Sequence, residues 1–305
     1  MIKHIFTDMD GTLLDTRGSL SDTNRWSVCL SDIPVTLVSA RSPIEMGPTL
    51  NKLQLKTPQI AFNGNLTFTQ NEFGIQVIEK HTLPADIVSA LLDYFSSNFP
   101  NVSLSWYSLA HWYIKKQDKG VFFQKALTGA EPRIKAFDGQ SEIYKIMLMS
   151  FNPEEMLQIE QALKELDIPD IHVTRSTVHT LEITSAEKTK ADAAEAILEE
   201  KEIDFEEIAA IGDGNNDIPL LKVAGLPIAV DNASEEVKAH VKIVVAKNTD
   251  HGVTEALSAI REINEQVTLW HLFLILPNLL DTPKPPFLVC FLVMAMLLNK
   301  LVRTS

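Results

Sequence analysis

The sequence predicts an α/β fold in which a parallel sheet carries a second, inserted α/β domain. Short apolar runs end in polar or glycine-containing stretches, which is typical of buried parallel strands. Helical patterns lie between these runs, and this alternation favours an open α/β sheet. From about residue 83 to 182 the pattern changes to a series of strand candidates with two helical stretches, which indicates the insertion.

The outer segments supply the elements of the parallel sheet. We expect strands and helices at Ile2–Phe6, Val35–Val38, Ile60–Phe62, Thr189–Lys201, Ile208–Ile211 and Pro219–Ala224. Ligands in such sheets bind beyond the carboxyl ends of the strands, so functional residues are expected directly after the strand runs.

The inserted segment has its own pattern. Its expected elements are Pro84–Ser97, Val102–Tyr107, Trp112–Lys116, Ile143–Met149, Pro153–Leu166, Ile171–Arg175 and Val178–Ile183. We therefore predict a core domain from residues 1–82 and 183–265, an inserted domain from residues 83–182, and an apolar extension at residues 266–305.

Composition sets limits on function. The chain has 305 residues, a net charge of −13 and 22% charged residues, so it has room for two domains. Its acidity does not favour binding to nucleic acid or to anionic membranes. Cys29 and Cys290 form no metal or disulfide pattern, and Asp8 and Asp10 interrupt any signal segment. A cytoplasmic protein is the default expectation.

The first strand run is followed at once by Asp8 and Asp10. Residues two apart on a strand point to the same side, so these carboxylates are expected to converge and to raise each other's pKa. A Mg²⁺ ion would remove that cost. A solvated turn that caps a helix is the alternative. A calcium loop does not fit, because Leu13 and Ser19 stand at positions six and twelve.

A second acidic group follows the run Ile208–Ile211. It contains Asp213 and Asp217, and a calcium loop fails here too, with Ile218 and Ala224 at positions six and twelve. The stretch is not a GxGxxG dinucleotide loop either. If the two strands are neighbours, four carboxylates surround one point. So much negative charge indicates a metal site.

These motifs resemble those of the haloacid-dehalogenase (HAD) superfamily of phosphatases. The similarity extends to its Cof-type, sugar-phosphatase-like branch, which has a Rossmann-like core and a large α/β cap. The motifs stand in order as DMDGT from Asp8, Ser39 at the end of VTLVS, a lysine in EITSAEKTKADA, and GDGNND from Gly212. FNGN at residues 62–65 and GLPIAVDNASEEVK at residues 225–238 also resemble family segments. The resemblance covers about residues 1–265.

The resemblance implies roles for the carboxylates. Asp8 would be the nucleophile that forms an aspartyl-phosphate, and Asp10 the general acid and then the general base. Mg²⁺ would be held by the Asp8 side chain, the Asp10 backbone carbonyl and Asp213. Asp217 would support the shell of the metal or its waters.

The resemblance also implies a catalytic lysine beside the nucleophile. Lys190 lies eight residues after Glu182, as the family spacing requires, and would stabilise Asp8 and the transferring phosphate. Lys188 is the alternative. The family usually has glycine where this chain has Ala191.

Further residues are expected to bind the phosphate group. Ser39 and Asn216 would contact it, with a helix N-cap and a loop cap as their respective alternatives. Ala40, Arg41 and Asn63 are expected to line the site, although Arg41 and Asn63 fit a structural loop role equally. Ser39-Ala40-Arg41 replaces the commoner Thr-Gly-Arg of the family.

The implied activity is Mg²⁺-dependent hydrolysis of a small phosphate monoester, such as a sugar phosphate, through an aspartyl-phosphate. Pyridoxal phosphate and other small monoesters stay open as substrates, because the family's caps set specificity and diverge freely. A phosphomutase and a non-catalytic regulatory protein on the same fold are the alternatives. The partner implied is a phosphorylated metabolite, and the sequence predicts no oligomeric state.

The C-terminal extension contains two strongly apolar runs, Leu269–Leu276 and Phe287–Leu298. Each is shorter than the ~20 residues that a transmembrane helix needs. An interfacial hairpin on a membrane, a segment packed on the body or a partner, and an aberrant carboxyl end are the three interpretations. We favour the last, so membrane contact is not favoured and the extension is expected to be dispensable.

Overall fold

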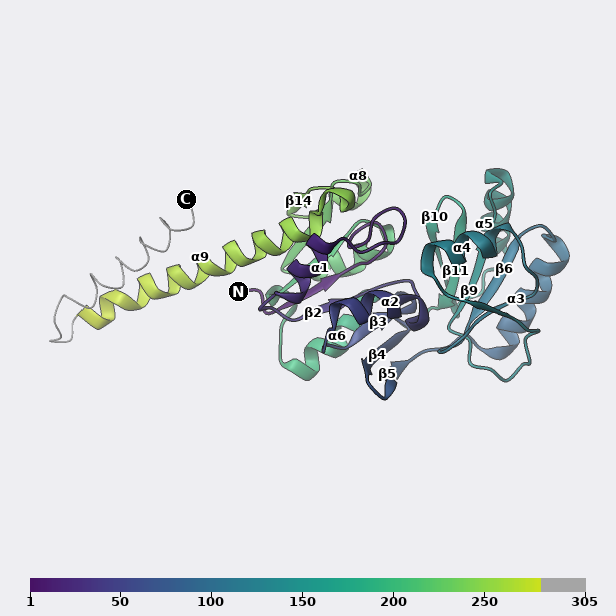
Figure 1. Cartoon of the computed structure of the whole chain (residues 1–305), viewed down its shortest axis with the longest axis horizontal. Helices are drawn as coiled ribbons and strands as arrows, with labels where there is room; N and C mark the ends of the chain where they lie inside the picture. The colour runs from purple at the N-terminus through teal and green to yellow at the C-terminus, as the bar shows by residue number, and fades with distance from the viewer. Residues whose placement is uncertain (281–305) are drawn as a thin grey trace. The chain divides into compact units, whose positions relative to one another are not determined.

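The computed structural model of the chain describes residues 1–280, with side chains described to residue 270. Within the described part of the chain, residues 2–258 form one compact unit. Figure 1 shows the elements of the compact unit, in which strands and helices alternate along the chain.

A five-stranded parallel sheet forms the core of this unit. Its order is β14-β13-β12-β1-β2, so β1 lies between β12 and β2. Thr7, the last residue of β1, pairs with Ile211 on one side and Leu37 on the other. The carboxyl ends of the three strands therefore meet at one edge of the sheet. The strands are β1 (His4–Thr7), β2 (Val35–Leu37), β12 (Ile208–Gly212), β13 (Leu226–Val230) and β14 (Ile243–Val245).

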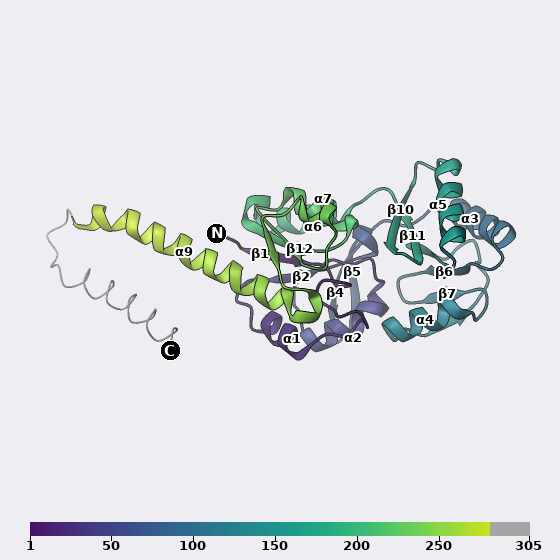
Figure 2. The same cartoon turned by 90° about the horizontal axis from the view of Figure 1, so that it is seen from above.

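Helices cover both faces of this sheet: α6 and α7 lie on one side of β1 and β12, and α1 and α2 lie on the other (Figure 2). Ala193 and Ala194 of α6 pack with Phe6 and Val38 of the sheet in one buried cluster. The small alanine side chains let the helix lie close to the strands. The helices are α1 (Asp22–Cys29), α2 (Pro43–Leu53), α6 (Lys190–Lys201), α7 (Ile218–Val223), α8 (Glu235–Lys238) and α9 (Gly252–Leu280).

Shorter elements complete the core. An antiparallel sheet of order β3-β4-β5 follows α2, and an isolated parallel bridge between Val38 and Ile60 joins it to the end of β2. These elements are β3 (Gln59–Ala61), β4 (Leu66–Asn71), β5 (Gly74–Lys80) and the 3₁₀ turns η1 (Phe62–Gly64), η2 (Phe205–Glu207), η3 (Asn215–Asp217) and η4 (Asn248–Asp250).

Residues 85–185 form a second α/β layer, which we call the cap. Its six-stranded sheet has the order β10-β11-β9-β6-β7-β8. One face packs on α3 and α5 through a hydrophobic cluster that includes Phe95, Leu148 and Ile159. The elements are α3 (Ala85–Asn98), β6 (Ser103–Tyr107), β7 (Trp112–Ile114), α4 (Lys119–Thr128), β8 (Pro132–Ile134), β9 (Lys145–Met149), α5 (Pro153–Leu166), β10 (Ile171–Thr177) and β11 (Thr180–Ser185).

The predicted fold class, a parallel-sheet core with an inserted α/β cap, is confirmed. Individual bounds differ by a few residues: β1 begins at His4 rather than Ile2, and β9 at Lys145 rather than Ile143. Apolar residues that flank a strand extend its hydrophobic pattern beyond its hydrogen-bonded part. The β4–β5 hairpin was not predicted, because its outer strand β5 is mostly exposed and lacks a continuous apolar run.

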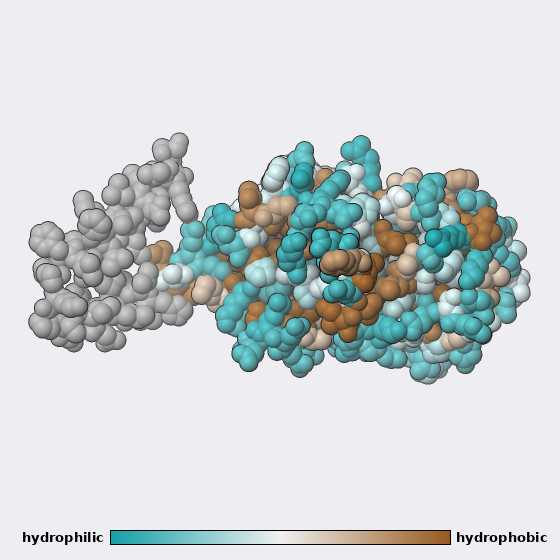
Figure 3. Space-filling model, turned by 60° about the horizontal axis from the view of Figure 1, so that its bottom comes forward, coloured by the Kyte–Doolittle hydropathy of each residue, from teal (hydrophilic) through white to brown (hydrophobic). Residues whose placement is uncertain are grey.

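The C-terminal prediction is only partly covered by the structure. The run Leu269–Leu276 falls within α9, and Phe287–Leu298 lies outside the described residues. None of the helices in the described part of the chain is both long enough and apolar enough to cross a membrane. On the face in Figure 3, hydrophilic residues are spread over the compact unit, with hydrophobic residues gathered in groups between them.

A buried histidine, His4, begins the strand β1. The Nε2 atom of His4 is 2.9 Å from the Thr36 hydroxyl of β2, and its ring is 4.7 Å from that of Phe6. Burial, with a contribution from the charge of Lys201, lowers the pKa of His4 from 6.5 to about 4. Between about pH 6.5 and about pH 4, His4 is therefore protonated in the unfolded chain but not in the folded chain.

We expect acid to destabilise the fold through His4. Its folded-state pKa is lowered, so the stability it contributes is present above pH 6.5 and is lost as the pH falls towards about 4. Between about pH 7 and about pH 5, the unfolding free energy of the wild-type protein should fall by about 2 kcal/mol more than that of His4→Gln. Urea denaturation at the two pH values measures both. His172→Gln, at an exposed histidine of β10, is the control. An unchanged pH dependence in His4→Gln would contradict this assignment.

Candidate active site

The chain turns sharply where β1 ends, and this turn brings Asp8 beside the end of β12. The Asp8 backbone N–H donates to the Ile211 carbonyl at 2.9 Å, which continues the pairing of the two strands. Gly11 has a φ of +81°, and a Cβ at this position would lie only 2.3 Å from Asp213 Oδ2. Only glycine therefore allows the loop after β1 to approach Asp213 so closely.

Three carboxylates meet at this edge of the sheet. Oxygen atoms of Asp8, Asp213 and Asp217, which we call the acidic cluster, all lie within 4.8 Å of one another. The Thr12 hydroxyl donates to Asp213 Oδ1 at 2.5 Å. The backbone N–H groups of Asp213 and Gly214 donate to Asp217 Oδ2 at 3.1 and 2.9 Å. These bonds fix the direction in which the carboxylates point.

Lys190 supplies the positive charge of this cluster. Its Nζ lies 2.7 Å from Asp8 Oδ1 and 2.6 Å from Asp217 Oδ1, and the side chain is 1% exposed. It is the first residue of α6, which starts here because Thr189 and Asp192 form a capping box. Lys188 points elsewhere and pairs with Glu79 at 3.2 Å.

The electrostatics of the cluster favour a bound cation. Burial raises the pKa of Asp8 well above its usual range, against the charge of Lys190. Burial also raises the pKa of Asp213 to about 7, although the hydrogen bond from Thr12 opposes the shift. Burial disfavours charge on Lys190, but Asp217 and Asp8 outweigh it and raise its pKa.

Three carboxylates thus share one ammonium group in a buried site. A hard divalent cation prefers such oxygen ligands, so the donor set of the acidic cluster fits Mg²⁺. Asp8, Asp213 and Asp217 are the side chains that could hold it.

Asp10 lies outside the acidic cluster. Its carboxylate accepts two hydrogen bonds from Arg41, from Nε at 2.7 Å and Nη2 at 2.6 Å. The expectation that the Asp8 and Asp10 side chains converge is therefore wrong. The strand β1 ends at Thr7, so the alternation of a strand does not extend over these two residues.

The remaining predicted residues gather around the same edge. Asn216 Nδ2 donates to Asn63 Oδ1 at 2.9 Å, and the Asn63 backbone N–H donates to the Ser39 carbonyl at 3.0 Å. Ser39 does not cap α2, since Ser42 holds that position. Its buried hydroxyl accepts from the Arg41 backbone N–H at 3.1 Å. Ala40 presents its carbonyl to the cap, where Lys145 Nζ donates to it at 2.9 Å.

Two asparagines that support the loop after β1 were not among the residues predicted from the sequence. Asn232 Nδ2 donates to the Gly11 carbonyl, and Asn248 Nδ2 donates to the Leu14 carbonyl, both at 2.8 Å. Asn232 stands in the stretch VDNAS, which was noted as family-like, so that resemblance was the available signal. Thr12 likewise stands in the family-like motif DMDGT, whereas no comparable signal marked Asn248.

Comparison with known proteins agrees with this geometry. A model of the haloacid dehalogenase-like hydrolase family matches residues 5–257. The chain belongs to this family. The enzyme class predicted from the sequence, a HAD-type hydrolase, is confirmed, and so is the resemblance on which it rested.

Two named relatives of this HAD-type hydrolase are phosphatases. A putative phosphatase of Haemophilus influenzae is 28% identical over 262 residues, which cover 83% of this chain and 96% of the relative. A 5-amino-6-(5-phospho-D-ribitylamino)uracil phosphatase of Bacillus subtilis is 27% identical, with coverage of 83% and 96%. A haloacid dehalogenase-like hydrolase of Bacteroides thetaiotaomicron superposes with a TM-score of 0.77 at 26% identity, with coverage of 85% and 100%.

We expect Gly11→Ala to disable the site. The added Cβ would lie 2.3 Å from Asp213 Oδ2 and would also strain a backbone with positive φ. Gly129→Ala is a matched control, because Gly129 also has a positive φ (+73°) but its Cβ would meet nothing within 4 Å. Both changes should cost about 1 kcal/mol in unfolding free energy from strain. Only Gly11→Ala should also lose hydrolytic activity, by at least about tenfold. Equal activity in the two variants would contradict the close approach.

Proposed function

We propose that this hydrolase is a Mg²⁺-dependent phosphatase that acts on a small phosphate monoester through an aspartyl-phosphate on Asp8. One observation carries the proposal: a buried lysine, Lys190, binds Asp8 at 2.7 Å inside a cluster of three carboxylates. The lysine holds one Asp8 oxygen and leaves the carboxylate oriented at the carboxyl edge of the sheet. That arrangement suits a nucleophile which must attack a negatively charged phosphate.

In the first step, an Asp8 oxygen attacks phosphorus, and the bond from phosphorus to the leaving oxygen breaks. Asp10 gives a proton to that oxygen. In the second step, Asp10 takes a proton from water, and the water oxygen attacks the phosphorus of the aspartyl-phosphate. The bond to Asp8 breaks and inorganic phosphate leaves. When bound, Mg²⁺ neutralises charge between Asp8 and the phosphate.

Arg41 and Lys190 keep the two carboxylates of the DMDGT motif in separate roles. Lys190 binds Asp8 within the acidic cluster, whereas Arg41 binds Asp10 outside it. The Asp10 side chain is 45% exposed, so solvent protons can reach it. Asp10 can therefore exchange protons while Asp8 remains buried.

Ser39, Ala40, Arg41, Asn63 and Asn216 surround this edge and are proposed to bind the phosphate group or line its site. The Asn216–Asn63 hydrogen bond ties the turn after β12 to the turn after β3. This support would hold the phosphate-binding residues in place before substrate arrives.

The relatives support a phosphorylated small molecule as the substrate. One of them is named for a phosphorylated ribitylaminouracil, which is a sugar-alcohol phosphate joined to a base. A sugar phosphate or similar metabolite is therefore the proposed substrate class. A phosphomutase would return the phosphate to a sugar rather than release it into water. A non-catalytic protein would not need Asp8, Asp10 and Lys190 together.

Asp8→Asn should reduce phosphatase activity to background while the fold persists. An amide cannot attack phosphorus as a carboxylate does. Release of inorganic phosphate measures activity, and circular dichroism with thermal unfolding checks the fold. Turnover at the wild-type rate in a clean preparation would rule out the proposed nucleophile.

Asp10→Asn should chiefly slow turnover, whereas Asp213→Asn should chiefly weaken Mg²⁺ binding. Loss of the acid and base group should slow turnover by roughly 10²–10⁴-fold in Asp10→Asn, with a smaller change in Mg²⁺ affinity. Asp213→Asn removes a carboxylate from the acidic cluster and should weaken Mg²⁺ binding, measured by calorimetry. An equal loss of Mg²⁺ binding in both variants would count against the role proposed for Asp10.

A further inference from the structure

The cap sheet has one face that is polar and yet buried. Tyr107, Lys145 and Thr184 pair side by side on strands β6, β9 and β11, and all three point to the same face. Ser105, Met147 and Glu182 form the adjacent row of the same face. We call these six residues the polar face. All of them are buried, and they lie opposite the face that packs on α3 and α5.

The polar face contains buried atoms that lack hydrogen bonds. Ser105 Oγ, Glu182 Oε2 and Thr184 Oγ1 have no partner within the part of the chain that the structure describes. A buried polar atom without a hydrogen-bond partner destabilises a fold, so three such atoms in two adjacent rows require an explanation. A polar ligand group that supplies the missing hydrogen bonds would remove this cost.

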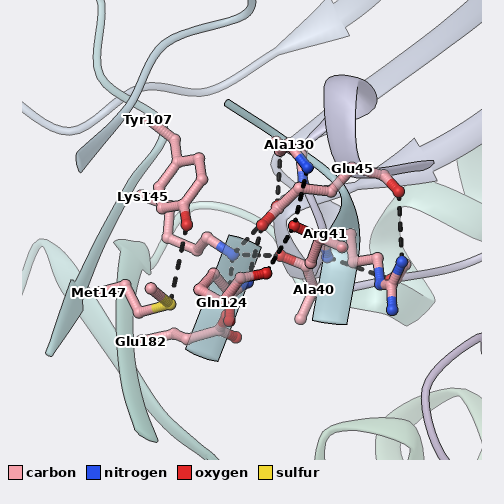
Figure 4. A network of polar contacts seen from close by, with 12 residues as sticks. Ala40, Arg41, Glu45, Tyr107, Gln124, Ala130, Lys145, Met147 and Glu182 are labelled. Atoms are coloured by element: carbon pink, nitrogen blue, oxygen red, sulfur yellow. Dashed lines mark hydrogen bonds and ion pairs between the residues drawn. The ribbon is translucent and has the colours of Figure 1, made fainter. Parts of the chain in front are cut away.

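The polar face lies beside the proposed phosphate site. Lys145 Nζ donates to the Ala40 carbonyl at 2.9 Å, and Ala40 is adjacent to Arg41 (Figure 4). Arg41 in turn binds Asp10. The charge of Asp10 acts on both Lys145 and Glu182. The polar face therefore approaches the site from the side of Asp10. Asp10 is the group proposed to give a proton to the leaving oxygen, so the leaving group would lie between Asp10 and the polar face.

The charges on this side are predominantly negative. Lys145 Nζ is 2.8 Å from Glu182 Oε1 and 3.9 Å from Glu45 Oε2, so one ammonium group faces two carboxyl groups. Gln124 of the cap also donates to Glu45 Oε1 at 2.8 Å. The positive charge of Lys145 is thus already paired with carboxyl groups of the protein. An anionic group placed here would meet Glu182 Oε2, and the neighbouring ammonium group of Lys145 already faces two carboxyl groups.

We propose that the polar face, chiefly Glu182, selects an uncharged, hydroxyl-rich leaving group and rejects one that carries a second anionic group. The inference rests on the proposed phosphatase function. Glu182 Oε2 accepts a hydrogen bond from a substrate hydroxyl, and the hydroxyls of Ser105 and Thr184 donate or accept others. A carboxylate or a second phosphate in that place is repelled.

The test compares sorbitol 6-phosphate with 6-phosphogluconate, which replaces the terminal alcohol by a carboxylate. At about pH 8 with Mg²⁺, the wild-type protein should prefer sorbitol 6-phosphate in kcat/KM by at least about tenfold. Glu182→Gln should reduce this preference by about tenfold, because the repelling charge is gone. Glu160→Gln is the matched control: it removes one cap carboxylate that pairs with Arg175 instead, and it should leave the preference unchanged.

Thr184→Val provides a second variant, in case Glu182→Gln does not fold. It replaces a partnerless hydroxyl by a methyl group of similar size. If Thr184 contacts the substrate, KM for sorbitol 6-phosphate should rise by about threefold or more. A purely structural role would change the unfolding free energy and leave KM as it was.

Acetyl phosphate has a leaving group too small to need the polar face. Its hydrolysis therefore distinguishes a failure of the inference about the polar face from a failure of the proposed phosphatase function. Each hexose derivative is also tested as a competitor of acetyl phosphate, so a compound that binds without turnover is still measured. Three results would overturn the inference about the polar face and leave the phosphatase function standing. They are equal kcat/KM for the two compounds, competition with acetyl phosphate by neither compound, and an unchanged ratio of the two kcat/KM values in Glu182→Gln. If the wild-type protein with Mg²⁺ hydrolyses none of the three compounds, the proposed phosphatase function fails as well.

Discussion

The ammonium group of Lys190 is the interaction on which the site depends. It lies between Asp8 and Asp217, both buried, and joins the end of β1, the start of α6 and the turn η3. Without it, three carboxylates would lie within 4.8 Å of one another and would lose the ion pairs that Lys190 makes with two of them. Burying charge is costly unless it is paired, so the lysine makes a compact acidic site compatible with a stable fold.

The surrounding structure serves to hold this pairing in place. The capping box of α6 fixes the backbone that carries Lys190, and backbone N–H groups of residues 213 and 214 fix Asp217. Gly11 lets the loop after β1 lie against Asp213. Arg41 performs the complementary task on the other side, where it holds Asp10 apart from the acidic cluster. Lys190 binds Asp8 and Arg41 binds Asp10, so the two carboxylates are held apart although they are only two positions apart in the sequence.

Much of the fold, and the meeting of Asp8, Asp213 and Asp217 at one edge of the sheet, could be predicted from the sequence. Apolar runs followed by acidic stretches indicated both central strands, and β1 and β12 are indeed neighbours. The direction of Asp10 could not be predicted, because it depends on where hydrogen bonding ends in β1 and on Arg41, 31 positions away. The network of Glu45, Lys145 and Glu182 was also not predicted. These residues come from α2, β9 and β11, and no local pattern relates them.

The pairing of β1 with β12 affects the order in which parts of the chain can fold during synthesis. Asp8 and Lys190 are 182 positions apart, with the whole cap between them. The cap strands pair among themselves over much shorter separations, and closing a longer loop costs more entropy. On a ribosome the cap can acquire its sheet while β1 still lacks its neighbour β12. Asp8, the proposed nucleophile, then gains its lysine and its acidic partners only when residues 190–217 have emerged, so a nascent chain carries no assembled acidic cluster until its core is nearly complete.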